Sequence, residues 1–173
     1  MALNPCLMSS ATDQWATPQW LVDACAEQWG PFDLDPAADA DNHKAPAYYT
    51  AAQDGLHRPW AGRVWLNPPY GAGIGDWCRR AAEATDKGEA ACVVACLPAR
   101  TDTSYWHAWV MRACEVRLLR GRVAFGGGTM PAPFPTAIVV WAGRMCRGPE
   151  ARVSCWDLRA RARGQLVLLD DEE

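Results

Sequence analysis

The clearest chemical signal in this sequence is the run Asn67, Pro68, Pro69 and Tyr70, which directly follows an apolar segment at residues 63–66. The asparagine offers an amide oxygen as an acceptor, and the two prolines fix two φ angles while removing two backbone donors. Tyr70 adds an aromatic ring that can stack on a planar group. The run predicts a rigid set of hydrogen-bond acceptors, although Asn-Pro and Pro-Pro are also typical of an ordinary turn.

Predicted strands and helices alternate along the chain, and they must position this run. Residues 32–35, 63–66, 90–97, 115–119 and 136–141 are predicted strands, and residues 18–29, 74–87 and 103–114 are predicted helices. The segment 90–97 is apolar throughout, which is typical of a parallel strand buried on both faces. The alternation predicts an α/β fold with a mainly parallel sheet, in which ligands bind beyond the carboxyl ends of the strands. Asn67 follows one such end.

The boundaries of the first elements come from their capping residues. Thr17 is expected to cap the first helix, with Pro18 at its first position and Gly30 as its stop. Pro36 ends the first strand, because a proline cannot donate to a central ladder.

The length of the chain favours a single domain. Its 173 residues are 50% hydrophobic, which is enough for one core. We expect this domain to span residues 1–142. Residues 143–173 are expected to form an arginine-rich appendage with an acidic tail, and not a separate domain.

The composition argues against several classes of protein. Charged residues make up 21% of the chain, no apolar run approaches the roughly 18 residues of a membrane helix, and residues 1–10 do not resemble a signal peptide. The eight cysteines lack zinc-knuckle spacing and several lie in apolar runs, which indicates reduced, mostly buried thiols. His43, His57 and His107 stand alone, so no metal site is predicted.

The net charge of −3 conceals a basic region. Residues 111–163 carry ten arginines and three acidic residues, whereas residues 1–110 are acidic overall. A local positive field can hold a polyanion even when the whole protein is acidic. The alternative is a solvated arginine-rich surface.

A wider set of segments resembles a known family. In order, these are Trp15-Ala16-Thr17-Pro18, Phe32-Asp33-Leu34-Asp35-Pro36-Ala37-Ala38, Asp54-Gly55-Leu56 with Trp60, Val64-Trp65-Leu66-Asn67-Pro68-Pro69-Tyr70-Gly71, Asp102-Thr103 with Trp106, Gly121-Arg122 with Phe125, and Pro133-Phe134-Pro135. The set covers about residues 15–141 and resembles the small phage-type DNA N6-adenine methyltransferases. This resemblance implies a single-domain, Rossmann-like fold of S-adenosylmethionine-dependent methyltransferases with a trimmed sheet. It also implies methyl transfer from S-adenosylmethionine to N6 of adenine in DNA.

The resemblance gives catalytic roles to Asn67, Pro68, Pro69 and Tyr70. The side-chain oxygen of Asn67 and the carbonyl of Pro68 would accept both N–H bonds of the adenine amino group, so that its nitrogen can become tetrahedral. Tyr70 would stack on the base, which must leave the duplex to reach this site. The methyl group passes directly from sulfonium to nitrogen, so no metal ion is required.

The same resemblance implies a binding site for S-adenosylmethionine. Its expected residues are Trp15, Thr17, Pro18, Asp33, Asp35, Pro36, Ala37 and Asp54. Asp35, with Asp33, would face the positively charged methionine end of the cofactor. The alternative for Asp35 is a strand-end carboxylate that caps the following loop.

The resemblance implies different roles for the other cofactor residues. Asp54 would accept a hydrogen bond from the adenine amino group of the cofactor, whereas Trp15 could close over the cofactor or simply pack. The resemblance identifies no ribose ligand, and Asp39 and Asp41 are the candidates.

The expected macromolecular partner is DNA, with no membrane involved, in the cytoplasm of a bacterial host if the protein is phage-encoded. Arg100, Arg120, Arg122 and the loop 126–135 are expected to face the DNA. The same tetrad also serves enzymes that methylate RNA bases or protein glutamine, and an inactive nucleic-acid-binding derivative is a further alternative. The sequence does not predict the oligomeric state.

Overall fold

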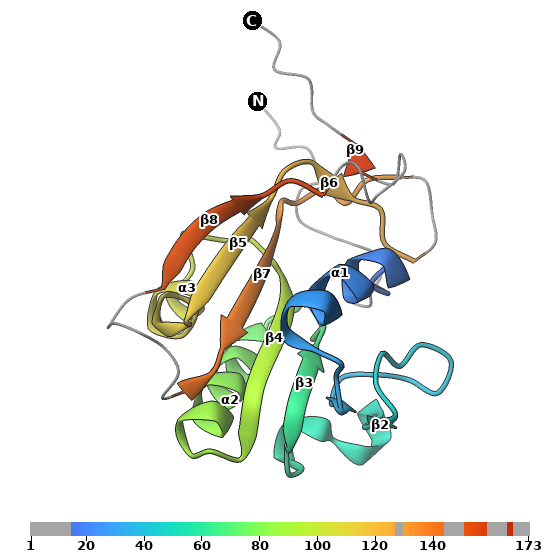
Figure 1. Ribbon diagram of the computed structural model, residues 1–173, viewed down its shortest axis with the longest axis vertical. Coiled ribbons are helices and arrows are strands. Elements are labelled where there is room, and N and C mark those ends of the chain that lie inside the picture. The colour runs from blue at the N-terminus through green and yellow to red at the C-terminus, as the bar shows by residue number, and fades with distance from the viewer. Residues whose placement is uncertain (1–14, 127–129, 144–150, 159–165, 168–173) are drawn as a thin grey trace, which may run out of the picture.

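The computed structural model describes residues 15–126, 130–143 and 151–158, and the backbone of residues 166–167. The main sheet has seven strands in the order β2-β1-β3-β4-β7-β5-β8 (Figure 1). These strands are β1 (Leu34–Asp35), β2 (Ala47–Tyr48), β3 (Gly62–Leu66), β4 (Ala90–Pro98), β5 (Glu115–Leu119), β7 (Thr136–Trp141) and β8 (Arg152–Trp156), while β6 (Arg122–Val123) pairs with β9 (Leu166–Val167) in a second sheet. The helices are α1 (Gln19–Trp29), α2 (Ile74–Asp86) and α3 (Ser104–Ala108), and the 3₁₀ turns are η2 (Ala51–Gln53), η3 (Gly55–His57) and η4 (Val110–Arg112).

Most neighbouring strands of the main sheet are parallel. β1 pairs in parallel with β2 and β3, β3 with β4, and β5 with β8, whereas β7 is antiparallel to both β4 and β5. This arrangement confirms the predicted α/β class and its Rossmann-like, mainly parallel sheet. The carboxyl ends of β1, β3, β4 and β5 therefore share one edge of the sheet, where β7 begins. We call it the carboxyl edge.

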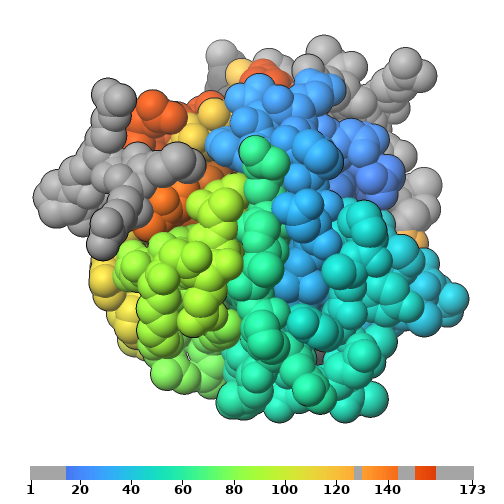
Figure 2. Space-filling view, turned by 60° about the horizontal axis from the view of Figure 1, so that its bottom comes forward, coloured from blue at the N-terminus to red at the C-terminus, as the bar shows by residue number. Residues whose placement is uncertain are grey.

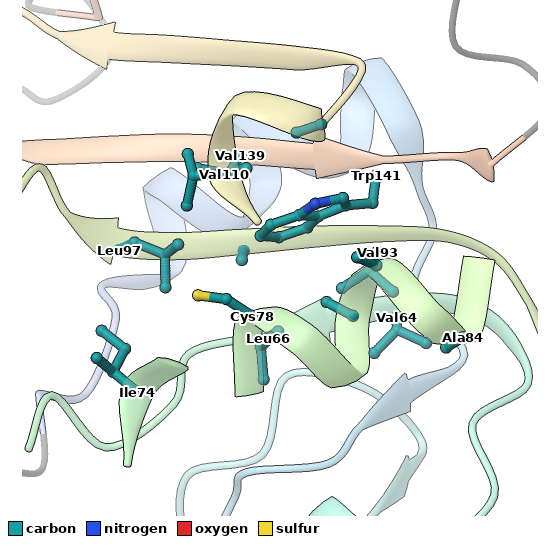
Figure 3. Packing of buried hydrophobic residues seen from close by; sticks show 14 of the residues in the cluster. Val64, Leu66, Ile74, Cys78, Ala84, Val93, Leu97, Val110, Val139 and Trp141 are labelled. Carbon is teal, nitrogen blue, oxygen red and sulfur yellow. The ribbon is translucent and has the colours of Figure 1, made fainter. Parts of the chain in front are cut away.

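The core lies on both faces of this sheet because successive side chains of a strand point to opposite faces. In β3, Val64 and Leu66 pack in the cluster that includes α2 and α3, whereas Trp65 packs in the cluster that includes α1. Figure 3 shows the first cluster, in which Cys78 of α2 lies between Leu66 and Leu97. β4 is apolar on both faces, as its unbroken apolar sequence predicts.

Two helix predictions needed correction. The first helix begins at Gln19 with Pro18 as its N-cap, so Thr17 does not cap it, and Thr17 is buried instead. The single helix expected at 103–114 is replaced by α3 and η4, because the backbone of Trp109 (φ −126°, ψ −42°) departs from helical geometry between them.

The segment after residue 143 contributes to the main sheet. β8 lies beside β5 as an edge strand, and the guanidinium of Arg117 in β5 lies 4.6 Å from the ring of Trp29 and 4.8 Å from that of Trp156. The carboxylate of Glu115 also accepts hydrogen bonds of 2.9 Å from Arg117 and Arg152. This part of the expected appendage therefore belongs to the main sheet, while the acidic tail lies outside the described residues.

The cysteines partly match the expectation of reduced thiols. Cys25, Cys78, Cys92, Cys96 and Cys155 are free, whereas Cys114 is disulfide-bonded, which corrects the prediction for that residue. In the described part of the chain, no helix has the length and hydropathy of a membrane span, and no cluster of three His, Cys, Asp or Glu side chains is arranged to hold a metal ion.

Candidate active site

A cavity of about 570 Å³ opens at the carboxyl edge of the sheet. Its walls are Trp15, Ala16, Pro36, Ala37, Ala38, Asp39, Asp41, Asn42, Thr50, Ala51, Asp54, Gly55, Asn67, Pro68, Pro69 and Trp77. The cavity thus brings together three of the segments that the sequence singled out: the loop after β1, the Asp54-Gly55 turn and the Asn67 to Pro69 run. Each follows a different element, and only the shared edge of the sheet makes them neighbours.

The first wall is the loop after β1, which Asp35 holds in place. Its two carboxylate oxygens accept hydrogen bonds from the backbone N–H of Ala37, at 3.3 Å, and of Lys44, at 3.0 Å. The cyan and teal surface of the segment that includes β2, η2 and η3 lies beside the blue surface of α1 (Figure 2). Asp35 is 3% exposed, and burial raises its pKa to about 6 despite these two hydrogen bonds. Asp35 thus caps the loop, as in the alternative that the sequence left open, and is not among the residues that line the cavity.

The second wall is the turn at Asp54 and Gly55. Asp54 adopts a left-handed conformation with φ 53°, which aspartate tolerates better than most residues. A Cβ atom at Gly55 would lie 1.9 Å from the carbonyl oxygen of Pro36, so only glycine lets the turn approach the first wall. The indole N–H of Trp60 donates to the Gly55 carbonyl at 2.8 Å. The carboxylate of Asp54 pairs with His57 Nδ1 at 2.8 Å and remains largely exposed.

The third wall is the corner after β3. The Asn67 side chain donates from Nδ2 to the carbonyl of Trp15, and its Oδ1 accepts a hydrogen bond from the Tyr70 hydroxyl at 2.7 Å. Pro68 and Pro69 follow on the same wall, and neither has a backbone N–H. Both ends of the Asn67 amide are therefore hydrogen-bonded, Nδ2 to Trp15 and Oδ1 to Tyr70, which fixes the orientation of its acceptor oxygen.

Tyr70 is buried beneath this corner. Its ring is only 3% exposed, and the rings of Phe125 and Phe134 contact it edge to face at centroid distances of 6.3 and 5.4 Å. Its hydroxyl also lies 3.1 Å from the carbonyl oxygen of Cys96. The ring is therefore packed inside the protein in this structure, and its stacking on a base stays a prediction.

Three other predicted cofactor residues do not line the cavity. The carboxylate of Asp33 accepts a 2.7 Å hydrogen bond from the backbone N–H of Arg63, near the start of β3. Thr17 is buried, with an exposed fraction of 3%, and is not among the residues of the cavity wall. Pro18 caps α1.

The predicted DNA-facing arginines follow strands of the same edge. Arg100 comes after β4, and its Nη1 donates to the carbonyl of Tyr70 at 3.2 Å. Arg120 follows β5 and pairs with Asp157 at 3.8 Å, and Arg122 lies in β6. The topology therefore places all three after strands that end at the carboxyl edge. The loop 126–135 lies partly outside the described residues.

Sequence reasoning missed several cavity residues. Ala16, Asn42, Thr50, Ala51, Gly55 and Trp77 all line the cavity without having been assigned to it. Trp77 comes from the first turns of α2 and lies beside Trp60, with ring centroids 6.2 Å apart and planes inclined by 25°. The position of Trp77 shortly after the Asn67 corner was the available signal, but helical spacing assigned it to the core.

The sequence of this chain resembles those of known proteins. Residues 6–139 match the family described as DNA N-6-adenine-methyltransferase (Dam). The chain is 40% identical over 65 residues to YfdM of Escherichia coli (strain K12), whose name places it among the methyltransferases; the match covers 34% of this chain and 71% of YfdM. It is 37% identical over 60 residues to the DNA N-6-adenine-methyltransferase of Escherichia phage T1, covering 34% of this chain and 25% of that protein. The family match spans most of the chain, from before the first wall to within β7, and this protein therefore belongs to the Dam family of adenine-specific DNA methyltransferases.

Proposed function

We propose that this protein transfers a methyl group from S-adenosylmethionine to N6 of an adenine that has left the DNA duplex. The observation that carries the proposal is the Asn67 corner on the wall of the 570 Å³ cavity, with the amide oriented by Trp15 and Tyr70. Membership of the Dam family supports DNA adenine methylation in general. The identity of the cofactor, the flipping of the base and the roles of individual residues are proposed from the site itself.

The residues around the cavity fit S-adenosylmethionine. The volume lies in the range of about 300–1,000 Å³ that is usual for small-ligand sites. Asp39, Asp41 and Asp54 supply carboxylates that suit ribose hydroxyls, an adenine amino group and a positively charged ligand. Ala37 and Ala38 let a ligand approach the backbone. When bound, the cofactor supplies an electrophilic methyl group on a sulfonium.

The Asn67 corner suits the adenine amino group, which accepts the methyl group. The adenine amino nitrogen is a weak nucleophile because its lone pair is delocalised into the ring. Asn67 Oδ1 accepts one hydrogen bond from Tyr70 and keeps a second acceptor site, which we assign to one N–H of the amino group; the Pro68 carbonyl accepts the other. Acceptors fixed in advance stabilise the positive charge that develops on this nitrogen in the transition state. The methylated nitrogen then releases one of its protons to solvent, because an amide oxygen and a backbone carbonyl are too weakly basic to keep it.

The DNA contacts follow from the position of the corner. A paired base cannot bring its amino group to the wall of a cavity, so the base must leave the stack, at a cost of a few kcal/mol. Arg100, Arg120 and Arg122 are assigned to the phosphates on either side of the extruded nucleotide, which would make binding strongly salt-dependent. Arg100 is also tied to the corner through the Tyr70 carbonyl.

The proposal is tested by offering DNA, RNA and protein side by side with methyl-deuterated S-adenosylmethionine, and analysing the products by mass spectrometry. We expect the label in N6-methyladenine from DNA alone. Label in RNA or in glutamine would replace the proposed substrate with one of those acceptors. No transfer, together with no heat of cofactor binding in calorimetry, would instead identify an inactive derivative.

A further inference from the structure

Met130 is the most exposed of the large apolar side chains in the described part of the chain, with an exposed fraction of 83%. Val153 of the edge strand β8 follows at 51%. Single exposed apolar residues are common on protein surfaces, so exposure alone gives neither of them a role. Their positions differ, because Met130 precedes β7, which begins at the carboxyl edge, whereas Val153 pairs with Val116 near the start of β5.

The residues that follow Met130 keep it near the Asn67 corner. The ring of Phe134 contacts the rings of Trp15 and Tyr70 edge to face, at centroid distances of 5.1 and 5.4 Å. Trp15 lines the cavity, and its carbonyl accepts the hydrogen bond from Asn67. Four residues of chain span at most about 14 Å, so the backbone of Met130 lies within that distance of the Phe134 backbone.

The segment that carries Met130 is stiff. Three of the five residues between Met130 and β7 are prolines, and each proline fixes its own φ angle. The first of them directly follows Met130 and disfavours a helical backbone there. Ala132 is 3% exposed, and its N–H donates to the carbonyl of Val123 at 2.9 Å. The Met130 side chain is therefore held in solvent by a backbone that cannot easily fold back over it.

The charge of this edge suits a duplex. Arg100 follows β4, Arg120 follows β5, and Arg122 lies in β6, which leads into the segment that carries Met130. These arginines are the ones assigned to DNA phosphates. A duplex that they hold lies along the same edge as the exposed Met130 side chain.

On the basis of the proposed function, we infer that Met130 enters the duplex and fills the space that the extruded adenine leaves in the base stack. Extrusion breaks the contacts of the target base with both of its neighbours, and an apolar side chain in the gap replaces part of them. Methionine is unbranched and flexible, so it can adapt to such a gap. Its removal from water also favours the inserted position.

The test compares two duplexes, after the target adenine has been located by sequencing the methylated bases that the wild type leaves in DNA. In one duplex the target adenine is paired, and in the other it lies opposite an abasic site. We expect Met130→Ala to lower the single-turnover methylation rate of the paired duplex about tenfold, the effect of losing roughly two buried methylene groups. The rate on the unpaired duplex should stay within about twofold of wild type, because extrusion there costs less.

A wild-type rate of Met130→Ala on the paired duplex, or an equal loss on both duplexes, would overturn the inference. Met130→Leu keeps an apolar side chain and should retain most of the wild-type rate, so a loss as large as that of Met130→Ala would also contradict it. Val153→Ala removes the other exposed apolar side chain and should match the wild type on both duplexes. The same duplex-specific loss in Val153→Ala would break the link to the position of Met130.

Extrusion can also be measured without methyl transfer. 2-Aminopurine is quenched in the base stack, and at the target position it should brighten when the wild type binds the duplex with S-adenosylhomocysteine. We expect a smaller increase with Met130→Ala, and an equal increase would contradict the inference. If the wild type methylates no adenine in DNA, the proposed function fails, and this inference with it. If the wild type methylates DNA and Met130→Ala behaves like it, only the inference is wrong.

Discussion

The two halves of the main sheet differ in what their residues do. On one side, β4, β7 and β5 are nine, six and five residues long, and their side chains fill both hydrophobic clusters. On the other side, β1 and β2 have two residues each, and the segments that follow β1, β2 and β3 form the three cavity walls. We call these the wide half and the narrow half.

This difference predicts which property a substitution in each half should change. In the wide half, apolar contacts repeat along each strand and hold the fold. In the narrow half, single polar groups hold each loop: the Asp35 carboxylate, the Gly55 carbonyl and the Asn67 amide. Substitutions in the wide half should therefore change the free energy of unfolding, whereas those in the narrow half should change ligand binding and rate.

The largest expected effect is in the wide half. Trp141 is 2% exposed, and its indole N–H donates to the Trp109 carbonyl at 3.0 Å. Trp141→Ala should lower the free energy of unfolding by about 3–5 kcal/mol in urea titrations, because it opens a cavity among packed side chains. Val153→Ala, at an exposed position of the edge strand, should change it by less than about 0.5 kcal/mol. An unchanged unfolding midpoint in Trp141→Ala would break the comparison.

The second prediction concerns the buried Asp35 carboxylate in the narrow half and its effect on the free energy of unfolding. The pKa of Asp35 is raised to about 6 by burial, above the value of about 3.9 expected in the unfolded chain. Between these two values the folded state binds a proton that the unfolded state does not. The contribution of Asp35 to stability is therefore fully present below pH 4 and is lost, by about 3 kcal/mol, as the pH rises through 6.

The measurement is urea unfolding of the wild type and Asp35→Asn between pH 4 and pH 7. The difference in unfolding free energy between the two should change across this window, because asparagine does not titrate. Asp76→Asn, at an exposed aspartate, serves as the control and should keep the wild-type pH dependence. Parallel pH profiles for the wild type and Asp35→Asn would show that Asp35 does not titrate near pH 6.

The smallest expected effect concerns the second wall. Asp54→Asn keeps a residue that tolerates the left-handed conformation but removes the charge. We expect the Kd for S-adenosylmethionine to rise about tenfold in calorimetry, because a hydrogen bond to a carboxylate is stronger than one to an amide. Asp23→Asn, on α1 and away from the cavity, should leave the Kd unchanged. Equal effects of the two substitutions would remove Asp54 from the proposed site.

The sequence predicted the wide half better than the narrow half. The strands at 115–119 and 136–141 match β5 and β7, because unbroken or regular apolar patterns define them. β8 carries little such pattern, since most of its side chains are exposed or half-buried, and it was missed. The composition of residues 143–173 indicated surface charge but not the strand beside β5.

In the site, the sequence indicated which functional groups line the cavity better than it indicated which side chains are buried. Asn67, Pro68 and Asp54 line the cavity, and the roles proposed for them depend on their own functional groups. The burial of Tyr70 depends on Phe125 and Phe134, which come from a distant part of the chain, so no local pattern could predict it. The loop cap by Asp35 was the alternative that the sequence left open, but its partner Lys44 lies nine residues away and is brought near only by the folded loop.

The most direct test of the central claim, that the Asn67 corner accepts the adenine amino group in the transition state, is the effect of Asn67→Ala. The single-turnover methylation rate on DNA should be measured together with the Kd for S-adenosylmethionine. We expect the rate to fall by about 10²–10³-fold, the usual loss for a fixed transition-state hydrogen-bonding group, with the Kd within a few-fold of the wild type. A wild-type rate, or a loss of cofactor binding as large as the loss of rate, would contradict this role for the corner.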